Sequence, residues 1–183
     1  ASTAPDVFVV FNRPKGKRTS YKLWQEDNQP PSFVLEITSK STLSEDQGTK
    51  RGLYAFLGIA EYFQYDPSAD YLDPPLQGYR LVDGNYLPLP ATPLADRVLS
   101  IHSEILGLAL HLEQGELRFY NPKTGEKLLS HAESEAARQT AEAARQTAEV
   151  ARQMAEAAQQ TAEDRAERLA ARLRDLGIDP DAL

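Results

Sequence analysis

FVLEIT, residues 33–38, is an apolar run with one carboxylate, Glu36, at its centre. Its β-branched and aromatic residues predict a strand, and its nearly continuous hydrophobicity predicts that both faces of this strand are covered. Counting by twos places Glu36 on the same face as Val34 and Thr38. An unpaired charge on a covered face costs several kcal/mol, so Glu36 is expected to have a positively charged partner and a functional role.

Similar runs on either side predict the rest of a sheet. Strands are expected at residues 7–11, 61–65, 79–82 and 86–87. Residues 106–120 predict a second hairpin, or the end of a helix that runs into one, with a turn at Gln114-Gly115. The stretch 44–47, SEDQ, has the spacing of a capping box and predicts a helix that ends near Gly58. Together these elements indicate an α/β domain.

Composition and charge limit the classes of function. A chain of 183 residues that is 41% hydrophobic is long enough for one globular domain and an appendage. The sequence has no cysteine, which excludes disulfides and thiolate chemistry and predicts a cytoplasmic protein. No apolar stretch approaches the length needed to cross a bilayer, so no membrane partner is expected. The net charge of −7 means that any binding of nucleic acid must rely on a local basic surface.

Beyond residue 130 the sequence changes into seven-residue repeats. EAARQTA occurs at residues 135–141 and again at 142–148, and two variants follow. Alanines alternate at spacings of four and three and form a heptad seam. After an interruption at Arg165 the seam is continued by Leu169, Leu173 and Leu176. The pattern predicts a long Ala-rich helix.

These changes in composition predict three segments. Residues 1–130 are expected to form the folded domain, residues 131–176 the Ala-rich helix, and residues 177–183 a tail. Charged flanks beside an uncharged seam favour a coiled coil, formed with a second copy of the chain or with another coiled-coil partner. The alternative is a single solvated helix of high intrinsic propensity.

Three charged residues are candidates for chemistry. Asp6 opens the first strand, so its carboxylate meets that of Glu36 if the first two strands are neighbours. Two such carboxylates repel each other unless a cation lies between them, and oxygen ligands suit Mg²⁺. Lys50 shares a helix face with Asp46 and Tyr54 and presents an ammonium group to the same sheet. The structural alternatives are a turn at Asp6, a cation paired with Glu36, and a lysine at the core edge paired with Asp46.

A basic loop follows the first strand. Its cations are Arg13, Lys15, Lys17, Arg18 and Lys22. They are expected to contact the phosphates of DNA, while Tyr21 and Trp24 nearby can stack on unpaired bases. A solvated loop without a ligand is the alternative.

The order of these residues resembles the bacterial family of restriction-endonuclease-like proteins known as Uma-two, within the PD-(D/E)XK nuclease superfamily. The resemblance extends from residue 5 to about residue 130. It rests on Pro5-Asp6, the stretch EITS at 36–39, Asp46 with Lys50 and Tyr54, the stretch GIAEYF at 58–63, and the stretch YDP at 65–67.

The resemblance implies a restriction-endonuclease-like mixed sheet flanked by helices. It also implies that Mg²⁺ or Mn²⁺ is held by Asp6, Glu36 and Ile37. The superfamily usually places a lysine two residues after the acid, where this chain has Thr38, so the lysine role is carried to Lys50, with Lys40 as a competitor. The implied catalytic residues are therefore Asp6, Glu36 and Lys50. A helical acid that often precedes the first strand in the superfamily is absent from this sequence.

Two functions are expected from these observations. The first is a Mg²⁺-dependent DNA endonuclease that hydrolyses phosphodiester bonds. The alternative is a catalytically inactive module with the nuclease fold, which acts through coiled-coil dimerisation or through docking of a partner.

Overall fold

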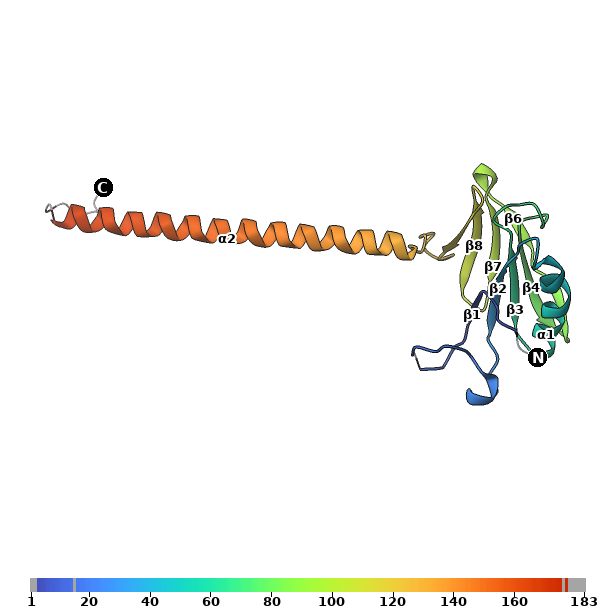
Figure 1. Ribbon diagram of the computed structural model, residues 1–183. Coiled ribbons are helices and arrows are strands. Elements are labelled where there is room, and N and C mark those ends of the chain that lie inside the picture. The colour runs from blue at the N-terminus through green and yellow to red at the C-terminus, as the bar shows by residue number, and fades with distance from the viewer. Residues whose placement is uncertain (1–2, 15, 176, 178–183) are drawn as a thin grey trace. The chain divides into compact units, whose positions relative to one another are not determined.

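The computed structural model describes residues 3–14, 16–175 and 177, and its contacts divide the chain into two units (Figure 1). The first unit comprises residues 1–128 and the second residues 129–183. Two β-sheets and a short helical segment make up the described part of the first unit, and one long helix dominates the second.

The first sheet is mixed, as the family resemblance implied. Its strand order is β1-β2-β3-β4-β5, and these strands are β1 (Val7–Val9), β2 (Phe33–Ile37), β3 (Glu61–Tyr65), β4 (Leu76–Val82) and β5 (Asn85–Pro88). Strands β2 and β3 run parallel, whereas the other neighbouring pairs run antiparallel. A parallel pair requires a crossover connection, and the helical segment between β2 and β3 supplies it.

This helical segment consists of η2 (Glu45–Lys50), a π-helical turn, followed by α1 (Arg51–Phe56). The capping box expected to begin at Ser44 is wrong, because Ser44 is already helical and its side chain makes no cap. The chain turns earlier, at Ser39, whose carbonyl oxygen accepts hydrogen bonds from the N–H groups of Thr42 (3.1 Å) and Leu43 (3.0 Å). In return, Thr42 Oγ1 accepts a hydrogen bond from Ser39 N–H (3.0 Å). These reciprocal hydrogen bonds between Ser39 and Thr42 satisfy backbone polar groups at the start of the helical segment.

The second sheet is antiparallel throughout, with the strand order β6-β7-β8-β9. Its strands are β6 (Ala91–Pro93), β7 (Leu99–Ser103), β8 (Leu108–Glu113) and β9 (Glu116–Tyr120). The hairpin predicted at Gln114-Gly115 is confirmed, since both residues have positive φ and join β8 to β9. Two short 3-10 turns lie in loops, η1 (Leu23–Gln25) and η3 (Ala95–Arg97).

The two faces of β2 pack against different layers. Phe33 and Leu35 face a core that includes Ile101 of β7 and Leu110 of β8. Val34 faces the opposite way and packs beneath the helical segment in a cluster with Tyr54, Ile59, Tyr62 and Tyr86. The predicted division of faces is confirmed. The expectation that helices flank the sheet on both sides is wrong for the described residues of this unit, because the second sheet covers one face.

The second unit contains α2 (His131–Asp175), a helix of 45 residues, about 68 Å at 1.5 Å per residue. Its start is capped by Ser130 Oγ, which accepts a hydrogen bond from Glu133 N–H (3.2 Å). Ion pairs along the surface join residues of the same helix, such as Arg152 and Glu149 at 3.0 Å. None of the described helices is apolar over a length that would cross a membrane. Leu176 and residues 178–183 lie outside the described residues.

Candidate active site

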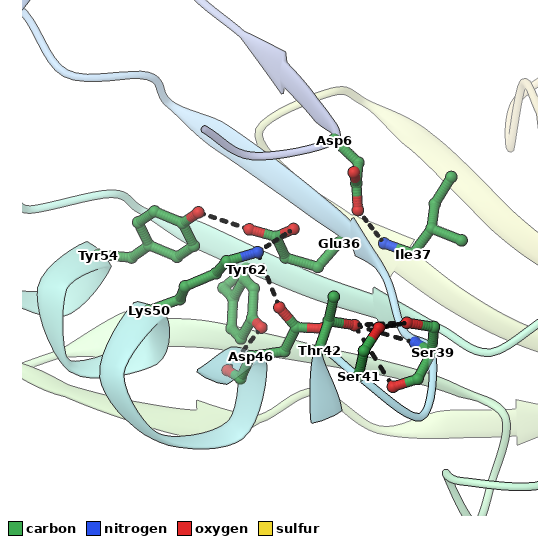
Figure 2. A network of polar contacts seen from close by, with 10 residues as sticks. All are labelled: Asp6, Glu36, Ile37, Ser39, Ser41, Thr42, Asp46, Lys50, Tyr54 and Tyr62. Atoms are coloured by element: carbon green, nitrogen blue, oxygen red, sulfur yellow. Dashed lines mark hydrogen bonds and ion pairs between the residues drawn. The ribbon is translucent and has the colours of Figure 1, made fainter. Parts of the chain in front are cut away.

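Glu36 lies at the centre of a buried polar network between β2 and the helical segment (Figure 2). Its side chain is fully buried, with 0% exposed. Oε1 accepts a hydrogen bond from Tyr54 Oη (2.5 Å), and Oε2 accepts one from Lys50 Nζ (3.0 Å). Burial raises the pKa of Glu36, and these two hydrogen bonds offset only part of that rise. The fold therefore keeps a carboxylate where its charge is disfavoured.

Lys50 connects Glu36 to a second buried carboxylate. Its Nζ atom lies 2.9 Å from Oδ1 of Asp46, a side chain with 0% exposed. Although burial by itself would lower the pKa of Lys50, its contacts with Asp46 and Glu36 raise it, so the ammonium group stays charged. The buried carboxylates that converge here are thus Glu36 and Asp46, and the cation between them is Lys50.

The π-helical turn aligns the residues that face Glu36. Between Asp46 and Tyr54 a regular α-helix would advance about 800°, which is about 80° beyond two full turns. The i→i+5 turn of η2 contains more residues per turn and takes up this difference. Asp46, Lys50 and Tyr54 consequently present their side chains to the same part of the sheet (Figure 2).

Several polar atoms in this buried layer have no hydrogen-bond partner among the described residues. They are Thr38 Oγ1, both amide atoms of Gln64, and both carboxylate oxygens of Asp46, although Asp46 Oδ1 keeps its ion-pair contact with Lys50. Gln64 lies beside Glu36 in the parallel register of β2 and β3. Each unmade hydrogen bond costs about 1–3 kcal/mol. The layer is therefore suited to receive water or a ligand.

Asp6 and Ile37 lie at the same end of β2 as Glu36 but outside this network. Asp6 Oδ2 accepts a hydrogen bond from Ile37 N–H (2.7 Å), and the register of β1 and β2 places Asp6 opposite Glu36. Figure 2 shows the Asp6 carboxylate directed at Ile37, on a hydrogen bond separate from those of Glu36. Within the described residues, no group of three or more His, Asp or Glu side chains is arranged to hold a metal ion.

The predicted basic loop is partly engaged with its own neighbours. Arg13 pairs with Asp27 (2.8 Å), and Arg18 pairs with Glu26 (2.8 Å). Tyr21 donates a hydrogen bond to Gln29 O (2.9 Å) and packs its ring against Phe8. These contacts shape the loop and occupy both guanidinium groups.

Lys17, Lys22 and Trp24 remain on the surface of this loop, and the indole of Trp24 is 74% exposed. Lys15 lies outside the described residues. The binding of DNA by these side chains stays a prediction.

A second buried glutamate was missed by the sequence reasoning. Glu61 has 0% of its side chain exposed, pairs with Arg80 (3.1 Å) and accepts hydrogen bonds from the hydroxyl of Ser103 and from Glu104 N–H (3.0 Å). These contacts join β3 and β4 to the end of β7 and to the loop after it, and they satisfy the carboxylate. Glu61 is thus a structural residue. The acid at the start of the apolar stretch EYFQY was the available signal, and Gln64 in the same stretch was a second one.

Comparison with known proteins places these residues in a family. The Uma2 family model, described as "Putative restriction endonuclease", matches residues 1–113. The match includes every strand from β1 to β8 and the whole network around Glu36. Among curated proteins, none matches the chain.

Proposed function

The chain belongs to the Uma2 family of restriction-endonuclease-like proteins, and from that premise we propose that it is a Mg²⁺-dependent DNA endonuclease. The observation that carries the proposal is the buried Glu36, whose raised pKa shows that the fold disfavours its charge. Perturbed carboxylates of this kind gather at functional sites. Lys50 and Tyr54 fix its two oxygens in place.

The oxygen donors at the end of β2 fit a magnesium ion. Asp6 and Glu36, together with the backbone carbonyl of Ile37, are the groups that would hold Mg²⁺ or Mn²⁺. Mg²⁺ usually keeps several waters and binds through one or two carboxylates, so it does not need three acidic side chains. When bound, the ion supplies an activated water and neutralises charge on a phosphate. Glu36 must release Lys50 or Tyr54 to serve as a ligand.

Lys50 acts in this proposal as a donor and not as a base, because its raised pKa keeps it protonated. Asp46 holds the ammonium when Glu36 releases it, since the 2.9 Å contact with Asp46 is independent of Glu36. The ammonium group, which stays paired with Asp46 but no longer with Glu36, can then stabilise the negative charge that develops on the phosphate. Tyr54, whose pKa burial raises, stays protonated and orients the Glu36 carboxylate.

Cleavage of plasmid DNA tests the proposal directly. The full-length protein with Mg²⁺ is expected to convert supercoiled plasmid to nicked or linear forms, and EDTA should stop the reaction. Replacing Mg²⁺ by Mn²⁺ should retain cleavage, because both ions accept oxygen ligands. A full-length protein that binds neither ion by calorimetry and leaves the plasmid intact would refute the proposal.

A second function, self-association through α2, is favoured by the seam of small residues. If the seam is followed through Ala166, it passes from Ala162 to Leu169 in steps of four and three, so the apolar line continues past Arg165. This extra step of four is the pattern of a stutter, which locally unwinds a coiled coil without breaking it. The occupant we propose for this seam is a second copy of the same helix.

Light scattering of the full-length protein tests this second proposal. The wild type is expected to be a dimer, and the double change Leu169→Glu with Leu173→Glu should shift it to a monomer, because like charges would meet in the seam. Gln160→Glu adds a charge outside the seam and should leave the dimer intact. A monomeric wild type, or equal effects of the two variants, would count against a dimer.

A further inference from the structure

An open pocket of about 500 Å³ lies where the parallel strands β2 and β3 end. In open α/β sheets, ligands bind in the crevice beyond the carboxyl ends of such strands. One wall follows β2 and enters the helical segment, and the other belongs to the loop after β3. The polar residues that line the pocket are Thr38, Ser39, Lys40, Ser41, Ser68 and Tyr71.

The lining of this pocket suits an anion. The residues that line it include hydroxyl-bearing side chains and Lys40 and no acidic residue, although the chain carries a net charge of −7. The backbone N–H groups of Lys40 and Ser41 lie in the turn that begins at Ser39, and neither makes a hydrogen bond within the described residues. Free N–H groups in a first helical turn attract negative charge.

An independent observation comes from Thr38. Its side chain is 2% exposed and lines the pocket, yet Oγ1 has no hydrogen-bond partner within the described residues. A buried hydroxyl without a hydrogen-bond partner is unfavourable, so a ligand or a water molecule is expected to supply the partner of Thr38 Oγ1. The Oγ1 atom is itself covered, so a rotation of the Thr38 side chain would present this hydroxyl to an anion in the pocket.

The opposite wall is held in place by Asp66. Although burial alone would raise its pKa, hydrogen bonds from Tyr71 N–H, Leu72 N–H and Ser68 lower the pKa of Asp66 to about 2. These donors stabilise Asp66 as a charged carboxylate within the loop, and Asp66 is not among the residues that line the pocket. The Ser68 hydroxyl already donates a hydrogen bond to Asp66 (2.7 Å). The side chains that can donate to an anion in the pocket are therefore those of Thr38, Ser41, Lys40 and Tyr71.

We propose that this pocket binds a phosphate group of the DNA backbone, next to the phosphate that is cleaved. Thr38 lies one residue beyond the end of β2 and follows Glu36 by two residues, a distance of about 7 Å in an extended chain. A phosphate held by Thr38 and the first helical turn would fix the adjacent phosphodiester in position beside Glu36. The assignment to DNA rests on the proposed nuclease function, whereas the binding of phosphate rests on the pocket alone.

Titration of the ¹⁵N-labelled full-length protein with inorganic phosphate tests the pocket. The amide signals of Lys40 and Ser41 are expected to shift with saturation. Thr38→Val should weaken phosphate binding by roughly 10-fold, because a hydrogen bond to a charged ligand is lost. The same variant should raise the Tm of the ligand-free protein by about 2–4 °C, because it removes a buried unpaired hydroxyl. Thr92→Val, an exposed position on β6, should change neither quantity.

The outcomes separate this inference from the nuclease proposal. If phosphate shifts no amide signal at Lys40 or Ser41, or if Thr38→Val binds it as tightly as the wild type, the pocket is not a phosphate site. If phosphate binds there and plasmid is never cleaved, the pocket stands and the nuclease proposal fails. If plasmid is cleaved, Thr38→Val should also raise the KM for DNA, and an unchanged KM would overturn the assignment to the backbone phosphate.

Discussion

Replacing Glu36 by glutamine is expected to lower the rate of plasmid cleavage by about 10²–10⁴-fold while leaving the Tm unchanged or higher. The loss of activity follows from the loss of a carboxylate that would ligate the ion. The gain or preservation of stability follows from the raised pKa, because burial disfavours the charged form even with Lys50 beside it. Glutamine has nearly the same shape and carries no charge. Cleavage rates and thermal melts of one preparation measure both effects.

Glu61 provides the matched control, since it is also a fully buried glutamate on a neighbouring strand. Glu61→Gln should show the reverse pattern, with a stability loss of about 1–3 kcal/mol and cleavage retained below its Tm. Its carboxylate accepts from Arg80, Ser103 and Glu104, and an amide cannot accept from all three. If Glu36→Gln cleaves as fast as the wild type, Glu36 is not part of the reaction.

Lys50→Met is expected to destabilise the domain by about 3–5 kcal/mol, which lowers the Tm by about 10–20 °C. The substitution keeps the apolar stem of the side chain and removes the ammonium that lies between Glu36 and Asp46. Two buried carboxylates are then left beside each other without a cation. Chemical denaturation at constant ionic strength measures the change in the free energy of unfolding.

The pH dependence of Lys50→Met has a defined sign. Without Lys50, the pKa of Glu36 rises further above its ordinary value of 4.5. A carboxyl group with a raised pKa binds its proton more tightly in the folded state than in the unfolded state. The contribution of Glu36 to stability should therefore be largest below about pH 4.5 and fall as the pH rises through its folded-state pKa. In the wild type this contribution of Glu36 to the free energy of unfolding should change with pH in the same direction and by a smaller amount.

Magnesium provides the complementary test for Lys50→Met. If Glu36 ligates the ion, Mg²⁺ should raise the Tm of this variant more than that of the wild type, because the ion replaces a missing positive charge. Lys123→Met, at an exposed surface position, is the control and should respond like the wild type. Equal Mg²⁺ responses of all three proteins would contradict a metal site at Glu36.

The strand that carries Glu36 was predictable from sequence because its pattern has a strong physical cause. The alternation in FVLEIT places large apolar residues in two separate clusters, and both clusters form. The need of Glu36 for a positively charged partner was also predictable, and Lys50 meets it. These inferences depend on local periodicity and on the cost of burying charge.

Other features depend on tertiary contacts that local patterns do not encode. Strands β6 and β7 were missed because Ala91–Pro93 contains a proline and Leu99–Ser103 carries Ser and His among its apolar residues. The ion pairs of Arg13 and Arg18 were missed because their acidic partners lie beyond the basic stretch, at Asp27 and Glu26. The burial of Gln64 follows from the parallel register with Glu36, which no spacing in the sequence specifies.

The π-helical turn allows the length of this segment to change by one residue without loss of the site. A deletion of one residue at Gly48 or Thr49 would let η2 become an ordinary α-helix in which Asp46 and Tyr54 stand seven residues apart. Seven residues advance about 700°, which is only about 20° short of two full turns. The side chains of the network would therefore still face the same carboxylate. In relatives of this chain, an alignment gap of one residue within these six positions would be compatible with an intact site, provided that Asp46, Lys50 and Tyr54 are all retained.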